Sequence, residues 1–313
     1  MAELLDLNMI LAAFGGGLFG AAIGALPSFI FCGFLVLAGE AITVAGGPAI
    51  ANAAGFTGAV GFGTLFGPHI GFAGGAAASA YAAHVKDSLE DGADILTPLL
   101  KIGADDTVWD ILVVGGIFGI IGYFLNGAFS VWQLPTDTIA LTVGVSALIH
   151  RVLFCNTGIF GTYDPEKSDS RWDPPASIAW LPFQMKASHL ITLGLGMGLV
   201  SGYVTLATGS IFIMFGIAAA SLIILETKGS GPVTHHIALP ASAAAAATGS
   251  ILMGGLYGIL GAVIGEFYAR LFYDWGDSHI DPPAWTIATL IFATIMLHGF
   301  NWSVPTEHLL ALF

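Results

Sequence analysis

VVGGIFGIIG (residues 113–122) and LMGGLYGILG (residues 252–261) are two stretches of one chain that match position by position. Four glycines fall in register, and the other six pairs are all apolar or aromatic. Two further pairs of segments match in the same order, namely residues 13–34 with 193–216 and residues 67–80 with 231–247. We therefore predict two copies of one unit, residues 1–155 and 187–313.

The composition is that of an integral membrane protein. Of the 313 residues, 56% are hydrophobic and 9% are charged, whereas soluble domains carry about 25% charged residues. Long apolar segments alternate with short polar breaks, which is typical of a helical multi-pass protein. The alternating ten-residue strands of a β-barrel are not seen. A net charge of -13 argues against a nucleic acid partner, so the predicted partners are the lipid bilayer and a small solute.

We predict an all-α polytopic membrane protein with about ten transmembrane segments, five in each copy. The third segment of each copy is rich in small residues and opens with Gly-Pro. Because the residue before a proline resists helix, we predict that these third segments are broken or re-entrant. Residues 156–186 form a predicted cytoplasmic linker with a short interfacial helix at 174–183. The ten predicted segments are residues 8–25, 27–45, 66–84, 108–130, 138–154, 188–204, 206–226, 233–249, 251–272 and 283–300.

Five crossings per copy would invert the second copy relative to the first. With the N-terminus outside, this threading puts all eight Lys and Arg residues on the cytoplasmic side, as expected for cytoplasmic loops. The alternative has four crossings per copy, a re-entrant third segment and the N-terminus inside, and it misplaces only Arg270. We favour the inverted repeat, in the cell (inner) membrane with extracytoplasmic termini. Glycine-rich outer faces also favour a homo-oligomer.

Two histidines occupy matching places at the head of the third segments. Superposing the copies pairs His69 with His236, and His235 lies next to the latter. Transporters with inverted repeats bind solutes near the bilayer midplane, where helices are broken. We therefore predict that these histidines line a solute pathway. The alternative, that they only pack against backbone carbonyls, stays open.

Other polar residues follow the repeat less closely. Glu40 and Glu226 end the second segment of each copy, and Asn126 lies within the fourth segment of the first copy. Polar side chains in the membrane are costly and commonly mark a pathway, so we add these three to the predicted pathway. The alternative for the two glutamates, that they are carboxylates in water at the membrane interface, is slightly favoured.

DSRWDPPA (residues 169–176) and DSHIDPPA (residues 277–284) share six of eight residues. Asp-Pro-Pro is typical of a helix start, with Asp as the N-cap and Pro in the first turn. Two similar helix caps would explain the match. A cytoplasmic vestibule would also explain it, and its predicted residues are Asp173, Asp277, His279 and Asp281.

The sequence favours a membrane channel or transporter over an enzyme. The predicted solute is a small neutral polar molecule or a cation moved together with a proton, because the predicted pathway contains no Lys or Arg. The alternative is an intramembrane enzyme, or the membrane subunit of a larger complex, that uses the Asp/His cluster near residues 274–281 together with His235 and His236. No cofactor motif occurs, and a metal site would have to be assembled across segments, for example from His69, His236 and a glutamate.

Overall fold

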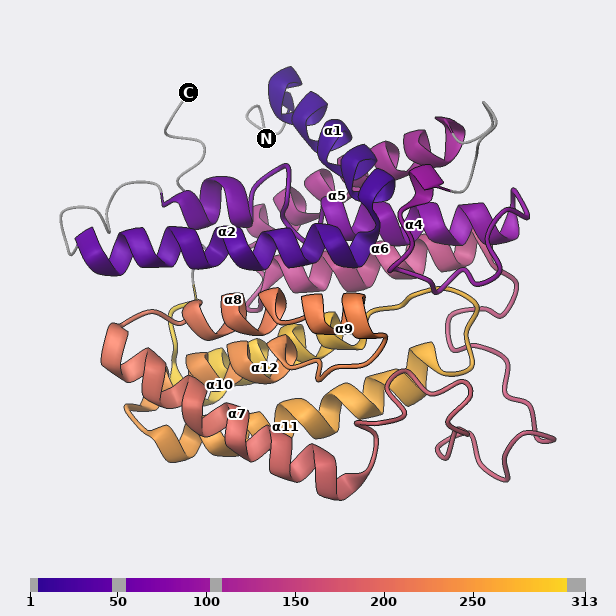
Figure 1. Cartoon of the computed structure of the whole chain (residues 1–313). Helices are drawn as coiled ribbons and strands as arrows, with labels where there is room; N and C mark the ends of the chain where they lie inside the picture. The colour runs from indigo at the N-terminus through magenta and orange to yellow at the C-terminus, as the bar shows by residue number, and fades with distance from the viewer. Residues whose placement is uncertain (1–4, 47–54, 102–108, 303–313) are drawn as a thin grey trace.

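The computed structural model describes residues 5–46, 55–101 and 109–302, and within these ranges the chain forms eleven α-helices and no strand. The first half contains α1 (Leu7–Ile23), α2 (Ala25–Gly46), α4 (Gly71–His84), α5 (Trp109–Val131) and α6 (Thr138–Phe154). The second half contains α7 (Ala187–Thr208), α8 (Ile213–Ala220), α9 (Ile223–Lys228), α10 (His235–Thr248), α11 (Ile251–Tyr268) and α12 (Pro282–His298). The halves form two stacked layers (Figure 1).

The described residues also contain three shorter helical turns. A π-helical turn at Thr57–Gly61 lies before α4, a second one at Ala269–Tyr273 extends α11, and Leu99–Lys101 forms a 3-10 turn. The two termini, residues 1–4 and 303–313, are predicted to be extracytoplasmic, and they lie outside the described residues.

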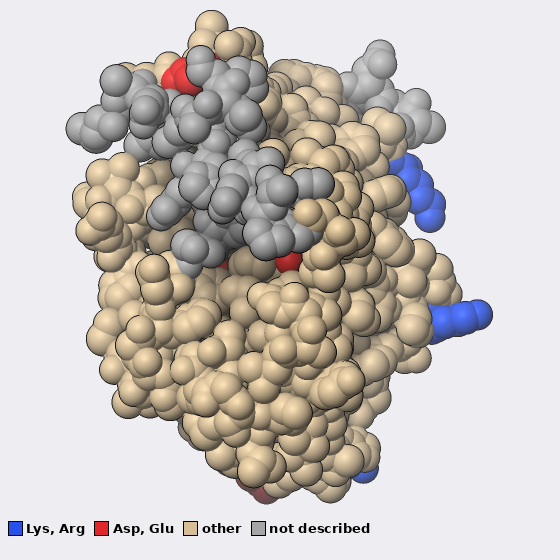
Figure 2. Space-filling model, turned by 90° about the vertical axis from the view of Figure 1, so that its left-hand side faces the viewer, with Lys and Arg blue, Asp and Glu red and all other residues tan. Residues whose placement is uncertain are grey.

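Four helices are long and apolar enough to cross a bilayer, namely α2, α5, α7 and α11 with its π-helical turn. Helices α1, α6 and α12 are also apolar but have 17 residues each, which is about 25 Å of helix. The end of the molecule where α2 and α7 terminate shows few charged side chains (Figure 2). The chain is therefore a helical membrane protein, as its composition predicts.

The matching glycines bring helix backbones into contact. Gly119 of α5 lies against Gly17 of α1, and Gly258 of α11 lies against Gly194 and Gly198 of α7. A Cβ atom at Gly119 or Gly258 would overlap the facing backbone. Small residues allow helices in lipid to approach this closely. The repeated glycine pattern is therefore explained by the same close helix pair in each half, α1 with α5 and α7 with α11.

The same packing pattern occurs in both halves. Helix α1 packs on α4 and α5, as α7 packs on α10 and α11, and the last two helices of each half pack together. Between the halves, α2 pairs with α8, and α6 pairs with α12. Each helix at the interface thus contacts the helix that holds its own place in the other half.

These interface pairs are antiparallel. In the α2–α8 pair, Gly33 lies beside Ala220, whereas the later residue Glu40 accepts a hydrogen bond from the earlier residue Ser210 (2.5 Å). The α6–α12 pair reverses in the same way, with Thr136 hydrogen-bonded to Ala288 and Arg151 hydrogen-bonded to Ser278. The two pairs of equivalent helices at the interface therefore run in opposite directions.

The third segments contain short helices that begin inside the protein. Helices α4 and α10 have 14 residues each, which is about 21 Å and less than the hydrocarbon core of about 30 Å. Gly122, in the middle of α5, lies against the carbonyl of His69, and Gly261, in the middle of α11, lies against the carbonyl of His236. Both helices thus start near the middle of their neighbours. His236 lies in the first turn of α10, and His69 lies in the turn just before α4.

One predicted segment, residues 206–226, is not continuous. The chain forms α8 and α9 with a break at residues 221–222. The Ser221 hydroxyl donates to the carbonyl of Ala218 (2.8 Å), and the Leu222 N–H donates to Ala219 instead of to the carbonyl four residues back. Such local hydrogen bonds compete with the α-helical ones. The equivalent helix α2 is continuous over 22 residues.

The short helix predicted at residues 174–183 of the linker is wrong. The linker forms successive turns over this stretch. The Trp180 N–H donates to Asp274 (2.9 Å) instead of to a helical carbonyl, and Pro182 has no N–H to donate. A helix here would lose two of the backbone hydrogen bonds within three residues.

Candidate functional site

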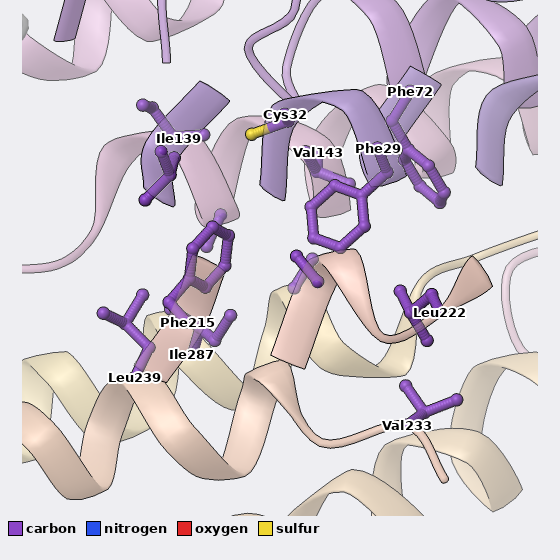
Figure 3. Close-up of a cluster of buried hydrophobic side chains, with 14 of the residues drawn as sticks. Phe29, Cys32, Phe72, Ile139, Val143, Phe215, Leu222, Val233, Leu239 and Ile287 are labelled. Atoms are coloured by element: carbon purple, nitrogen blue, oxygen red, sulfur yellow. The ribbon is translucent and has the colours of Figure 1, made fainter. Parts of the chain in front are cut away.

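A cavity of about 80 Å³ lies where the two halves meet, which is room for a few waters or a small solute. Equivalent positions of the halves line it, including Phe72 with Leu239 and Val143 with Ile287. Figure 3 shows these side chains gathered with Phe29 of α2 at the interface. Most of the wall is therefore apolar and comes from both halves alike.

Two aspartates interrupt this apolar wall. Asp137 caps α6 by accepting the Ala140 N–H, and Asp281 caps α12 by accepting the Ala284 N–H, each at 2.9 Å. These two caps hold the same place in the two halves. Two helix N-termini therefore face the cavity, and each carries a carboxylate at its cap.

The two histidines of the cavity both come from the second half. His235 and His279 line it. Pro135 and His279 each lie two residues before a capping aspartate, so they are equivalent positions of the two halves. The pairing of His69 with His236 likewise makes Pro68 the equivalent of His235. The first half therefore has proline at both positions where the second half has histidine. The shape of the cavity is shared between the halves, but its titratable imidazoles are not.

Each of these histidines keeps a ring nitrogen without a partner. The Nε2 of His279 lies 3.1 Å from Oδ1 of Asp281, while its Nδ1 is buried with no hydrogen bond. His235 is 6% exposed, its Nδ1 also lacks a partner, and its ring packs on Phe29 with centroids 4.7 Å apart. Buried polar atoms are normally hydrogen-bonded, so these nitrogens are available to a solute, a water or a proton.

The charge of the cavity is one-sided. Among the described residues that line it are two aspartates, and none is Lys or Arg. A carboxylate in an apolar wall is costly unless a positive charge, a proton or hydrogen-bond donors compensate it. The site therefore favours a cation, a proton or a neutral solute with hydrogen-bond donors over an anion.

His69 and His236 lie behind this wall and are not among the cavity residues. They do hold equivalent places, because each carbonyl faces the matching glycine, Gly122 or Gly261. The His236 ring lies beside Gly265 and Trp180, with neither ring nitrogen hydrogen-bonded. The pairing inferred from the sequence thus places these two histidines next to the cavity, with His235 inside it.

The other predicted pathway residues are scattered. Glu40 is buried and accepts hydrogen bonds from the Thr57 and Ser210 hydroxyls at 2.7 and 2.5 Å, so it joins α2 to the π-helical turn and to the start of α8. Glu226 on α9 and Asn126 on α5 are half-buried, and each has one oxygen without a partner. None of the three lines the cavity.

The predicted vestibule residues separate into three places. Asp173 is exposed on the linker, whereas His279 and Asp281 belong to the cavity. Asp277 accepts hydrogen bonds from the Thr157 hydroxyl (2.5 Å) and the Asn156 N–H (2.9 Å). The four residues therefore do not form one vestibule.

A buried arginine organises the chain around Asp277. Arg151 is fully buried, its Nε donates to the Ser278 hydroxyl (2.6 Å), and it lies 3.6 Å from Oδ1 of Asp277. Partial burial raises the pKa of Asp277, but the hydrogen bonds from Thr157 and Asn156 and the charge of Arg151 outweigh it and lower the pKa. This carboxylate is therefore ionised and fixed at neutral pH.

Asp137 was not identified from the sequence, although it holds in the first half the position that Asp281 holds in the second. Its signal was present as Pro-Thr-Asp-Thr (135–138), a helix cap at the place where the second copy has His-Ile-Asp-Pro (279–282). The match is too short to be found without the register of the two helices that follow it.

A family model of unknown function, DUF7973, matches this chain over residues 1–169 and again over residues 164–304. The chain belongs to this family. No curated protein and no solved structure matches it significantly.

Proposed function

We propose that this protein is a membrane channel or transporter that moves a small solute through the cavity between its halves. The cavity carries the proposal, because it places two carboxylates and two imidazoles in an apolar wall between two halves that pack alike and meet through antiparallel helix pairs. Transport sites of inverted-repeat proteins lie at such an interface, near broken helices. The proposed solute is a small neutral polar molecule or a cation that moves with a proton.

The proposed topology is a ten-pass inverted repeat with extracytoplasmic termini. Its support is that equivalent helices at the interface are antiparallel. The loop before α12 also lies with the linker at one end, since Asp274 bonds Trp180 and Asp277 bonds Asn156. The four-crossing alternative would put that loop and the linker on opposite sides of the membrane. The inner membrane location and the homo-oligomer remain part of this proposal.

In this proposal the cavity residues have different roles. Asp137 and Asp281 would bind the positive charge or the hydrogen-bond donors of the solute. His279 would exchange a proton next to Asp281, since its Nε2 faces that carboxylate and its Nδ1 is free. His235 would offer a second free nitrogen.

A flux assay in proteoliposomes tests the proposal. Stopped-flow light scattering would follow urea, glycerol, ammonium and potassium entering vesicles with and without the protein. We expect at least one of them to enter faster with the wild-type protein. Asp281→Asn should slow that flux about tenfold or more, because a hydrogen bond to a charged group contributes about 1.5–3 kcal/mol.

Asp173→Asn is the matched control, because it removes the same charge from an exposed position of the linker. It should leave the flux unchanged. If no probe enters faster than in protein-free vesicles, or if both variants behave alike, the proposal fails. Co-purification of another chain would then favour the alternative, a membrane subunit or an intramembrane enzyme.

A further inference from the structure

Three potential metal ligands of different types converge at one end of the molecule, away from the cavity wall. They are His84 at the end of α4, Cys155 just after α6, and Asp277 in the loop before α12. One ligand atom of each lies within 4.8 Å of the other two, and all three residues are half-buried. Residues from both halves therefore meet at a point that solvent can reach.

The surrounding contacts hold these three groups in place. Oδ2 of Asp277 lies 4.0 Å from Nε2 of His84, and the Cys155 Sγ lies 4.0 Å from the Asp277 carbonyl. The Asp277 carboxylate is fixed by Thr157, Asn156 and Arg151. Outer hydrogen bonds of this kind orient metal ligands and strengthen binding. Nε2 of His84 contacts the Asp277 carbonyl at 2.5 Å, and this contact would have to break for Nε2 to bind a metal.

We propose that His84, Cys155 and Asp277 bind a divalent transition-metal ion of the zinc class, with water as the fourth ligand. Thiolate, imidazole and carboxylate together suit tetrahedral Zn²⁺, with bonds of about 2.0–2.3 Å. Binding would release the proton of the Cys155 thiol to solvent, since the thiolate is the ligand. The nearby Arg151 offsets one of the two negative ligand charges, so the occupied site carries a net positive charge.

The comparison between the halves shows that this ligand set is not a by-product of the fold. The helix register that pairs Asp137 with Asp281 places Gln133 in the position of Asp277, and Gly299 in the position of Cys155. Neither residue is a usual zinc ligand. The proposed site therefore exists at one end of the molecule, whereas the equivalent place at the other end lacks it.

Occupation of the site would join the two halves at that end. His84 and Cys155 belong to the first half, and Asp277 belongs to the second. A ligand that binds only the folded state raises its stability by mass action. We therefore expect Zn²⁺ to raise the Tm of the purified protein, whether or not the central cavity transports anything.

Cobalt absorption tests the site directly. Full-length protein would be purified in detergent under reducing conditions, stripped with a chelator and titrated with Co²⁺, followed by Zn²⁺ competition. We expect one equivalent to bind, with tetrahedral d–d bands and a thiolate-to-cobalt charge-transfer band. Cys155→Ser should abolish the charge-transfer band, and His84→Gln should weaken Zn²⁺ binding about a hundredfold or more, since even outer partners are worth about 10–100-fold.

Two control variants test whether the loss of binding is specific to the proposed ligands. Cys32→Ala removes the other cysteine, which is buried in α2, and His189→Gln removes an exposed histidine. Both controls should bind Co²⁺ as the wild type does, and the Tm of each apo variant reports its folding. The proposal is overturned if the folded wild type shows no charge-transfer band, or if Cys155→Ser and His84→Gln bind Zn²⁺ with wild-type affinity.

Discussion

The first and second halves of this protein share their helix packing but differ at the positions that carry chemistry. In both halves a glycine-lined helix pair supports a short helix that begins inside the protein. His235 and His279 of the second half line the cavity, whereas the equivalent residues of the first half are Pro68, which also lines it, and Pro135. Packing constrains both halves to the same shape, whereas a side chain that faces a cavity can differ without altering that shape.

A second difference lies at the cytoplasmic end of the proposed topology. The buried Arg151 of α6 has Ile295 as its counterpart on α12. At one end of the molecule, α6 is therefore joined to the loop before α12 by hydrogen bonds and an ion pair of Arg151. The equivalent position at the other end carries an aliphatic side chain.

Removal of the buried arginine should have the largest effect. Arg151→Met leaves Asp277 without its ion pair, and breaking a buried pair costs about 3–5 kcal/mol. Ile295→Met, at the equivalent position, should cost less than about 1.5 kcal/mol because the volume is nearly kept. Thermal unfolding in detergent checks both variants. Equal losses at the two positions would show that the halves do not differ here.

The glycine contacts should respond alike in both halves. Gly119→Ala and Gly258→Ala each force a Cβ into a facing backbone, and such overpacking costs about 1–3 kcal/mol. Gly196→Ala on α7 is the control, since its Cβ meets nothing within 4 Å. We expect a lower Tm for the first two variants and an unchanged or higher Tm for the control. A loss in only one half would contradict the shared helix pair.

The two capping aspartates should be alike in stability and unlike in transport. Asparagine caps helices about as well as aspartate, so Asp137→Asn and Asp281→Asn should each cost less stability than the loss of the cap, which is about 0.5–2 kcal/mol. Flux should fall further for Asp281→Asn, because only Asp281 has a histidine partner, at 3.1 Å. Stopped-flow flux at matched protein density measures the difference. A larger fall for Asp137→Asn would contradict the assigned role of His279.

The smallest effect is expected at Asp274, which bonds the linker. Burial raises the pKa of Asp274 to about 6 from 3.8. Because the folded-state pKa is the higher one, ionisation above pH 6 destabilises the folded protein, and this penalty disappears as the pH falls through 6 towards 3.8. Asp274→Asn should therefore raise the Tm by about 2–4 °C at pH 8 and have little effect at pH 4. Equal shifts at both pH values would disprove this assignment.

The sequence predicts the helices well because the signals for them are local. Apolar length and Gly-Pro breaks place nine of the ten predicted segments within a few residues of their helices. The exception is residues 206–226, where the hydroxyl of Ser221 helps to divide the helix. The pairing of His69 with His236 could also be predicted, because matching glycines surround both residues.

The site is harder to predict because it depends on which way each residue faces. His235 and His236 are adjacent, and only the packing of α10 against α2 and α8 decides that the first of them enters the cavity. His84, Cys155 and Asp277 are far apart in sequence, and their spacing matches no metal motif. Their proximity arises from the antiparallel packing of α6 and α12 together with the packing of α4 on α6.

The central claim is that the two halves form an inverted repeat. It is tested most directly by finding the side of the membrane on which the two termini and the linker lie. Compartment-sensitive reporters at the N- and C-termini, together with impermeant maleimide labelling of Glu166→Cys in the linker, would locate all three points. An odd number of crossings per half puts both termini on the side opposite the linker, and we predict this result. Both termini and the linker on the same side would mean an even number, and the proposed inverted repeat would be wrong.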